Sequence, residues 1–186
     1  GLDRDKQWYY QNKQMLAEIE SVVLEDQVVK NLLDSAKITD KTVGIVPVHL
    51  YGNPCDMNKI CAIAEKYNLW IIEDCAQAHL ARFNHRPVGT FGSAAAWSFY
   101  PTKNLGALGD AGAVTSQRAD LLDFVCKFRN YGQTDRYHHD LAGQNSRLDE
   151  MQATILSVRL AYLQGWTASR RSIAKRYWKH INHRNI

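Results

Sequence analysis

The order of apolar and helical segments between residues 42 and 73 constrains the fold more than any other feature. A first apolar run is followed by an amphipathic segment that Asp56 can cap and that reaches Tyr67, and a second apolar run follows it. Two strands that are joined by a helix lie parallel in one sheet. The helix is the crossover that carries the chain back to the edge of the sheet where the first strand began. The predicted strands cover residues 42–50, 69–73, 93–100 and 112–116. The sequence therefore predicts an α/β protein with a mostly parallel sheet flanked by helices.

The remaining helices are predicted from apolar periodicity. They cover residues 13–24, 119–129, 147–163 and 168–182. Ser146 and Asp149 have the spacing of a capping box at the start of the third of these helices. A stripe along that helix is expected to face the core or a dimer interface, and it consists of Leu148, Met151, Ile155, Val158 and Tyr162.

Polar residues directly follow two of the predicted strands. Asp74 and Gln77 come after the strand 69–73, and Lys103 lies in a glycine-rich turn after the strand 93–100. Ligands of open α/β sheets bind beyond the carboxyl ends of the strands, so these side chains are placed where a ligand would lie. A lysine that loses hydration presents an uncharged amine, which can attack a carbonyl group. Two plainer alternatives remain at this point: Asp74 as a cap of the following turn, and Lys103 as a solvated loop residue.

Composition excludes several classes of function. The 186 residues carry a net charge of +4, and the basic excess near the C-terminus is expected to form the solvated face of a helix rather than a nucleic-acid site. The four cysteines show no C-x-x-C pairing, so no metal site is predicted, and they are expected to stay reduced in the cytoplasm. The sequence contains no G-x-x-x-x-G-K-[ST] loop, no apolar span long enough for a membrane helix and no signal peptide.

Four blocks together resemble the sugar aminotransferases of the DegT/DnrJ/EryC1/StrS family. In order, they are Val48–Gly52 (VHLYG), Ile72–His79 (IEDCAQAH), Ser98–Ala113 (SFYPTKNLGALGDAGA) and Gly143–Ala153 (GQNSRLDEMQA). The resemblance covers residues 38–177 and implies part of the large domain of a type I fold that depends on pyridoxal 5'-phosphate. It implies three parts of the chain: a helical segment over 1–30, a partial cofactor-binding large domain over 31–165, and a helix over 166–186 that starts a smaller domain.

The resemblance also implies roles for individual residues. Lys103 matches the lysine that bonds to the cofactor and moves protons, and Asp74 matches the partner of the pyridine nitrogen. Gln77 matches the contact of the ring's phenolic oxygen. Ser98 and Asn145 match contacts of the cofactor phosphate, with Asn145 donated by the other subunit of a homodimer.

The family's activity implies amino transfer from an amino acid, with glutamate as the expected donor, to a nucleotide-linked keto-sugar, in amino-sugar biosynthesis. A family dehydratase is disfavoured, because in those enzymes histidine replaces the lysine at the position of Lys103. Relative to the family the chain reads as truncated, internally and at its C-terminal side, and lacks the turn that holds the phosphate and the aromatic residue that stacks on the ring. The alternative is therefore a non-catalytic remnant or interaction module of the same fold.

Overall fold

The computed structural model describes residues 37–181. The helix predicted over residues 13–24 lies outside the described residues. The elements from β1 onward all belong to one compact unit that begins at Val43. No helix in this described part combines the length and the apolar character that a membrane crossing requires.

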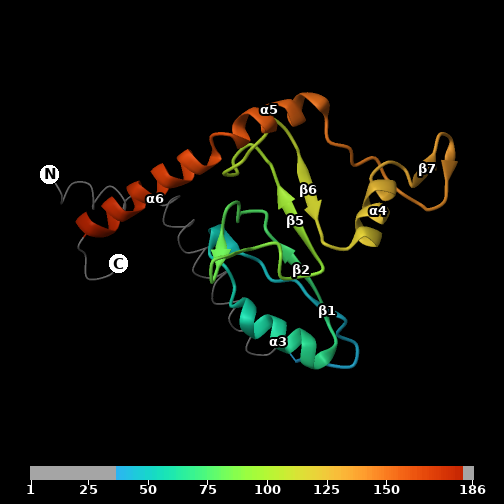
Figure 1. Cartoon of the computed structure of the whole chain (residues 1–186), viewed down its shortest axis with the longest axis horizontal. Coiled ribbons are helices and arrows are strands. Elements are labelled where there is room, and N and C mark those ends of the chain that lie inside the picture. Colours follow the sequence, from blue (N-terminus) through green and yellow to red (C-terminus); the bar gives the residue numbers. More distant parts are fainter. Residues whose placement is uncertain (1–36, 182–186) are drawn as a thin grey trace, which may run out of the picture. The chain divides into compact units, whose positions relative to one another are not determined.

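A four-stranded sheet in the order β1-β2-β5-β6 forms the centre of this unit (Figure 1). Its first three strands run parallel and the last pair is antiparallel. The strands are β1 (Gly44–Ile45), β2 (Trp70–Asp74), β5 (Ala94–Ser98) and β6 (Gly112–Thr115). The predicted mostly parallel sheet is thus confirmed. The strand predicted over 42–50 is much shorter, and past β1 it pairs again only at Val48, which bridges to Asp74.

Helix α3 (Met57–Tyr67) supplies the crossover between β1 and β2. It starts where expected, since the Asp56 side chain accepts a hydrogen bond from Lys59 N–H at 3.2 Å. The helix ends at Asn68, whose left-handed backbone (φ 52°) stops it. Its Met57 and Ala64 are buried together with Ile71 of β2, so one face of this half of the sheet is covered by the helix.

Two short hairpins were not predicted. Strands β3 (Arg82–Phe83) and β4 (Arg86–Pro87) are joined by Asn84 and His85, both with positive φ. Such two-residue loops match the right-handed twist of the flanking strands, but a strand of two residues is too short for an apolar pattern to reveal. The second hairpin pairs β7 (Gln133–Asp135) with β8 (His138–His139).

Three helices follow the sheet in the chain. They are α4 (Ala119–Phe128), α5 (Glu150–Leu160) and α6 (Leu163–His180), and a 3-10 turn, η1 (Leu50–Gly52), lies between β1 and α3. The predicted capping box is wrong in one detail. Asp149 itself is the cap and accepts from the N–H groups of Met151 and Gln152, so the helix begins after it and Ser146 lies outside.

Only part of the predicted stripe along α5 packs against the core, and Leu148 belongs to that part. Leu156 of α5 and Leu163 at the start of α6 are buried with Leu105 and Ala107, whereas Met151, Val158 and Tyr162 are exposed. Leu156 and Leu163 each lie one residue after a position of the predicted stripe, Ile155 and Tyr162. Sequence periodicity located the helix but could not select the face that the loop between β5 and β6 covers.

Candidate active site

The carboxyl ends of three parallel strands meet at one edge of the sheet. Val48, Asp74 and Ala96 lie in one row, since Val48 bridges to Asp74 and Asp74 pairs with Ala96. Because side chains alternate along a strand, Ser98 shares the face of Ala96 and therefore of Asp74. Val48 and Val114, which pairs with Ala96, also lie on this face and are exposed. The face that carries Asp74 is thus accessible in the described part of the chain.

Asp74 and Gln77 are fixed by backbone groups and still offer hydrogen-bonding atoms. Asp74 Oδ1 accepts from Ala76 N–H at 2.9 Å, which is the turn cap that the sequence left open as an alternative. Gln77 Oε1 accepts from Tyr51 N–H at 2.8 Å and so ties the turn after β2 to η1. Within residues 37–181, Asp74 Oδ2 and the Gln77 amide N–H groups have no hydrogen bond. Both are free to bind a ligand.

Ser98 is the last residue of β5, and Lys103 lies in the loop that follows it. The Ser98 hydroxyl accepts from Tyr100 N–H at 3.3 Å, and the Lys103 backbone N–H donates to the Tyr100 carbonyl at 2.9 Å. Ser98 lines a cavity of about 710 Å³ together with Arg129 and Arg147. The Lys103 side chain is half-buried and, in the described part of the chain, its Nζ forms no ion pair.

The His79 ring packs against Trp97, on the face of β5 opposite Ser98, although the charge of Lys103 reaches it. The sequence assigned it no role. Its ring lies 5.7 Å from the rings of both Trp97 and Phe99, and the residue is only 7% exposed. Neither ring nitrogen has a hydrogen-bond partner among the described residues. Burial lowers the pKa of His79, and the positive charge of Lys103 lowers it further. The nearby Ser98 backbone raises this pKa, but by less. A buried imidazole with two unpartnered nitrogens therefore lies within the electrostatic reach of Lys103.

Asn145 lies in a different segment. It forms a backbone bridge with Asn130, just past the end of α4, and its side-chain oxygen accepts from Arg147 Nε at 3.2 Å. Asp74, Gln77 and Ser98 are thus brought to one edge of the sheet with Lys103 in the following loop. Asn145 does not line the cavity with Ser98, although its neighbours Ser146 and Arg147 do.

A second buried group, next to Asp74 in the chain but on the opposite face, was also missed. Glu73 accepts hydrogen bonds from His49 Nε2 at 3.0 Å and from the backbone N–H groups of Gly89, Phe91 and Gly92 at 2.7–2.8 Å. Burial alone would raise the pKa of Glu73, but these hydrogen bonds outweigh it and hold the pKa below its usual value. The only sequence signal was a charged residue within an apolar strand.

The same group contains three types of residue that ligate metals. The group consists of His49, Glu73 and Cys75. Each offers one atom that can ligate a metal, and these three atoms lie within 4.8 Å of one another. His49 Nδ1 accepts from Cys55 N–H, so both ring nitrogens are used, and burial raises the pKa of Cys75 to about 12. A saturated histidine and a protonated thiol make poor metal ligands, so the arrangement favours a structural hydrogen-bond network.

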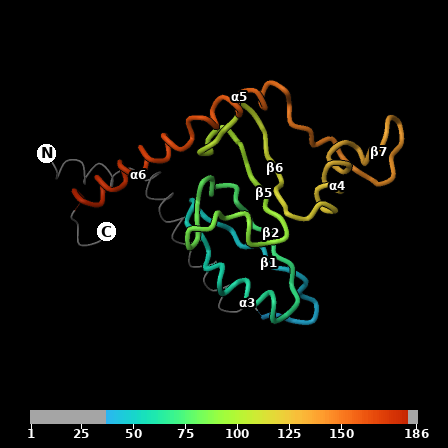
Figure 2. Tube along the Cα trace, in the orientation of Figure 1, coloured from blue at the N-terminus to red at the C-terminus, as the bar shows by residue number. Residues whose placement is uncertain are grey.

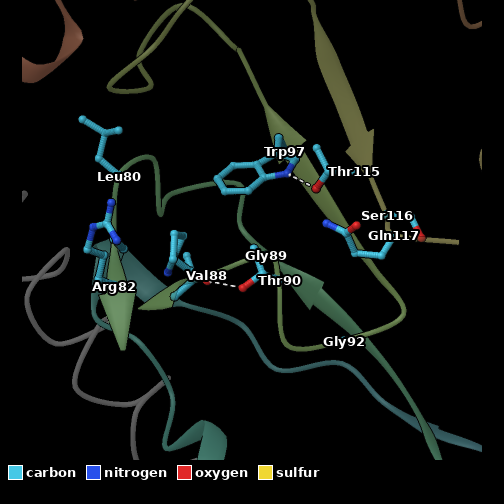
Figure 3. Close-up of a pocket in the computed structure, with 12 residues that line it drawn as sticks. Leu80, Arg82, Val88, Gly89, Thr90, Gly92, Trp97, Thr115, Ser116 and Gln117 are labelled. Atoms are coloured by element: carbon cyan, nitrogen blue, oxygen red, sulfur yellow. Dashed lines mark hydrogen bonds between the residues drawn. The ribbon is translucent and has the colours of Figure 1, made fainter. Parts of the chain in front are cut away.

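A cavity of about 350 Å³ lies on the face opposite Asp74 (Figure 3). Trp97 forms its wall and donates from its indole N–H to the Thr115 hydroxyl at 2.9 Å. Leu80, Arg82 and Gln117 also line it. Trp97 alternates with Ser98 along β5, so this cavity contains none of the predicted site residues.

Comparison with known proteins identifies the family. The model of the DegT/DnrJ/EryC1/StrS aminotransferase family matches residues 23–185. The chain is 47% identical over 146 residues to dTDP-3-amino-3,4,6-trideoxy-alpha-D-glucose transaminase of Streptomyces venezuelae, covering 78% of this chain and 38% of that protein. It is 54% identical over 145 residues to dTDP-3-amino-3,6-dideoxy-alpha-D-galactopyranose transaminase of Aneurinibacillus thermoaerophilus, covering 78% and 40%.

Solved structures agree. S. venezuelae DesV in complex with a ketimine intermediate superposes with a TM-score of 0.74 at 48% identity, over 76% of this chain and 38% of DesV. NtdA from Bacillus subtilis with bound cofactor PMP gives a TM-score of 0.63 at 35% identity, over 68% and 29%. The chain thus spans well under half the length of these relatives. The predicted partial large domain is confirmed by this likeness, and the chain belongs to the DegT/DnrJ/EryC1/StrS aminotransferase family.

Proposed function

We propose that this chain provides the lysine-bearing part of an aminotransferase that uses pyridoxal 5'-phosphate. The observation that carries the proposal is the common edge where β2 and β5 end: Asp74 and Ser98 share one face of the sheet, and Lys103 follows in the next loop. The substrate is a nucleotide-linked keto-sugar and the amino donor an amino acid such as glutamate. The names of the transaminases with 47% and 54% identity support this substrate class.

The atoms left free in the structure fit the proposed cofactor. Asp74 Oδ2 suits the N–H of a pyridinium ring, and the Gln77 amide suits its phenolic oxygen. The Ser98 hydroxyl accepts one hydrogen bond and keeps its own proton to donate to a phosphate. The Lys103 amine has no competing carboxylate in the described part of the chain.

Each residue has a distinct part in the proposed reaction. When bound, pyridoxal 5'-phosphate supplies an electron sink that stabilises a carbanion next to the transferred amino group. Asp74 keeps a proton on the ring nitrogen, because a carboxylate favours the charged form of its partner. Lys103 Nζ would hold the cofactor, and as a free amine it would take a proton from the donor's α-carbon and deliver it to the cofactor. Gln77 and Ser98 orient the ring and its phosphate.

The proposal extends to assembly and location. We propose a homodimer in which Asn145 of one subunit reaches the cofactor phosphate of the other, and in which the large domain spans residues 31–165. The exposed apolar side chains of Met151, Val158 and Tyr162 support burial of this face against a partner. A cytoplasmic location suits four cysteines that form no disulfide. Sedimentation would measure the dimer, and cell fractionation would test the location.

Covalent trapping tests the proposal directly. The chain is incubated with pyridoxal 5'-phosphate, reduced with borohydride and digested, and the labelled lysine is found by mass spectrometry. The expected label is on Lys103, and Lys103→Ala removes it, whereas the control Lys66→Ala at the exposed end of α3 does not. Label spread over several surface lysines, or none at all, would instead support the non-catalytic alternative. An assay with glutamate and a panel of keto-sugar nucleotides then tests the substrate class.

A further inference from the structure

Helix α5 holds the backbone of the loop that carries Lys103 at two points. Leu108 N–H donates to Gln152 Oε1 at 2.8 Å, and Arg159 Nη1 donates to the Gly106 carbonyl at 2.6 Å. Gln152 and Arg159 are seven residues apart, two turns of helix, so both side chains lie on the face that meets the loop. Figure 2 shows the segment between β5 and β6 running beside α5.

The contact between the two hydrogen bonds is apolar and closely packed. Leu105 and Ala107 of the loop are buried with Leu156 of α5, which lies between Gln152 and Arg159 on the same face. Gly106 admits no side chain here, since a Cβ would lie 2.6 Å from the Pro101 carbonyl oxygen. The packing holds the loop against the helix, and the approach of Gly106 to Pro101 keeps the turn that carries Lys103 compact.

Arg159 is itself held in place. Its guanidinium lies over the ring of Trp166, 5.7 Å from the centroid, and its bond to Gly106 joins residues 53 apart in sequence. A hydrogen bond from a charged donor to a carbonyl is among the stronger ones in a protein. The helix therefore fixes the loop only a few residues beyond Lys103.

We propose that Gln152 and Arg159 are positioning residues that set the place of Lys103 at the edge where Asp74 lies. The inference rests on the proposed function, because it assigns these two residues a purpose only if Lys103 reacts. A lysine side chain is long and flexible, so the reach of Nζ depends on where the backbone is held. Reactive groups must be held to about 0.5 Å for efficient chemistry.

The experiment has two readouts on the full chain. Hydrogen exchange without cofactor reports the loop, and borohydride trapping over a range of pyridoxal 5'-phosphate concentrations reports Lys103. The variants are Gln152→Ala and Arg159→Ala, with Gln152→Glu as the conservative variant that keeps an acceptor for Leu108. The matched controls are Thr154→Ala and Ser157→Ala, whose hydroxyls bond only to the carbonyls of their own helix.

We expect each alanine variant to raise the rate of hydrogen exchange in residues 103–108 about tenfold. The cofactor concentration that half-saturates trapping at Lys103 should also rise about tenfold, which corresponds to about 1.4 kcal/mol. Gln152→Glu and the controls should match the unaltered chain. Increased exchange across the whole of α5 with unchanged trapping would mean a merely structural role and would overturn the inference. Unchanged hydrogen exchange in residues 103–108 would overturn it too. No adduct at Lys103 in the unaltered chain would refute the proposed function itself, and the inference with it.

Discussion

Replacing Glu73 by glutamine tests how far the fold depends on one buried carboxylate. Its two oxygens accept four hydrogen bonds, from the His49 ring and from the N–H groups of Gly89, Phe91 and Gly92. Glutamine has a single oxygen, so two of these donors would face an NH₂ group instead of an acceptor. Hydrogen bonds to a charged group contribute about 1.5–3 kcal/mol each. Relief of the buried charge offsets part of the loss, so we expect a net decrease in the free energy of unfolding of about 3 kcal/mol.

Urea unfolding followed by far-UV circular dichroism and tryptophan fluorescence measures this change. Glu65→Gln on the exposed surface of α3 is the matched control and should stay within about 0.5 kcal/mol of the unaltered chain. A loss below about 1 kcal/mol in Glu73→Gln would contradict our reading that these four hydrogen bonds are formed and buried.

The pH dependence of the same difference provides an independent check. The pKa of Glu73 is lower in the folded chain than in the unfolded chain. Its contribution to stability is therefore fully present above the unfolded pKa and is lost as the pH falls through the folded pKa. The stability difference between the unaltered chain and Glu73→Gln should begin to shrink as the pH falls below about 4.3, the ordinary pKa of glutamate. It should close only below the lowered pKa of the folded chain, where both residues are neutral. A difference that stays constant into acid would show that the charge of Glu73 is not what the site stabilises.

Three further predictions follow from other residues. His79→Phe should raise the melting temperature, because a buried imidazole without partners costs about 1–3 kcal/mol and a phenyl ring keeps the contacts with Trp97 and Phe99. The variant should also lack the loss of stability that the lowered pKa of His79 causes as the pH falls below 6.5. A lower melting temperature of the variant at pH 8 would contradict the first expectation. Asp149→Ala should destabilise the chain by about 1 kcal/mol in urea unfolding while Ser146→Ala has no effect, and the reverse order would restore the predicted capping box. The chain by itself should bind pyridoxal 5'-phosphate only weakly in a spectroscopic titration. Ser98 offers one hydroxyl donor, whereas a phosphate is usually held by several N–H donors. Micromolar affinity would refute this prediction.

Local sequence was sufficient to predict the strands β2, β5 and β6 and the helices α3 and α4 closely. Apolar runs of this length and amphipathic periods with a capping residue such as Asp56 are decided by near neighbours in the chain. The placement of Asp74 and Lys103 past the ends of strands follows from the same patterns. The order of strand, helix and strand also implied the parallel pairing, because a crossover through a helix admits little else.

Tertiary structure decided the features that depend on residues far apart in the sequence. The pairing of Glu73 with His49 joins positions 24 residues apart, and the contact of Arg159 with Gly106 spans 53. No local pattern records such contacts, so the buried face of α5 was predicted one residue away from where the loop after Lys103 meets it. Sequence alone predicted which residues would carry the chemistry. Packing between distant segments determined which neighbours hold them, because side-chain burial is settled only when the whole sheet and its helices assemble.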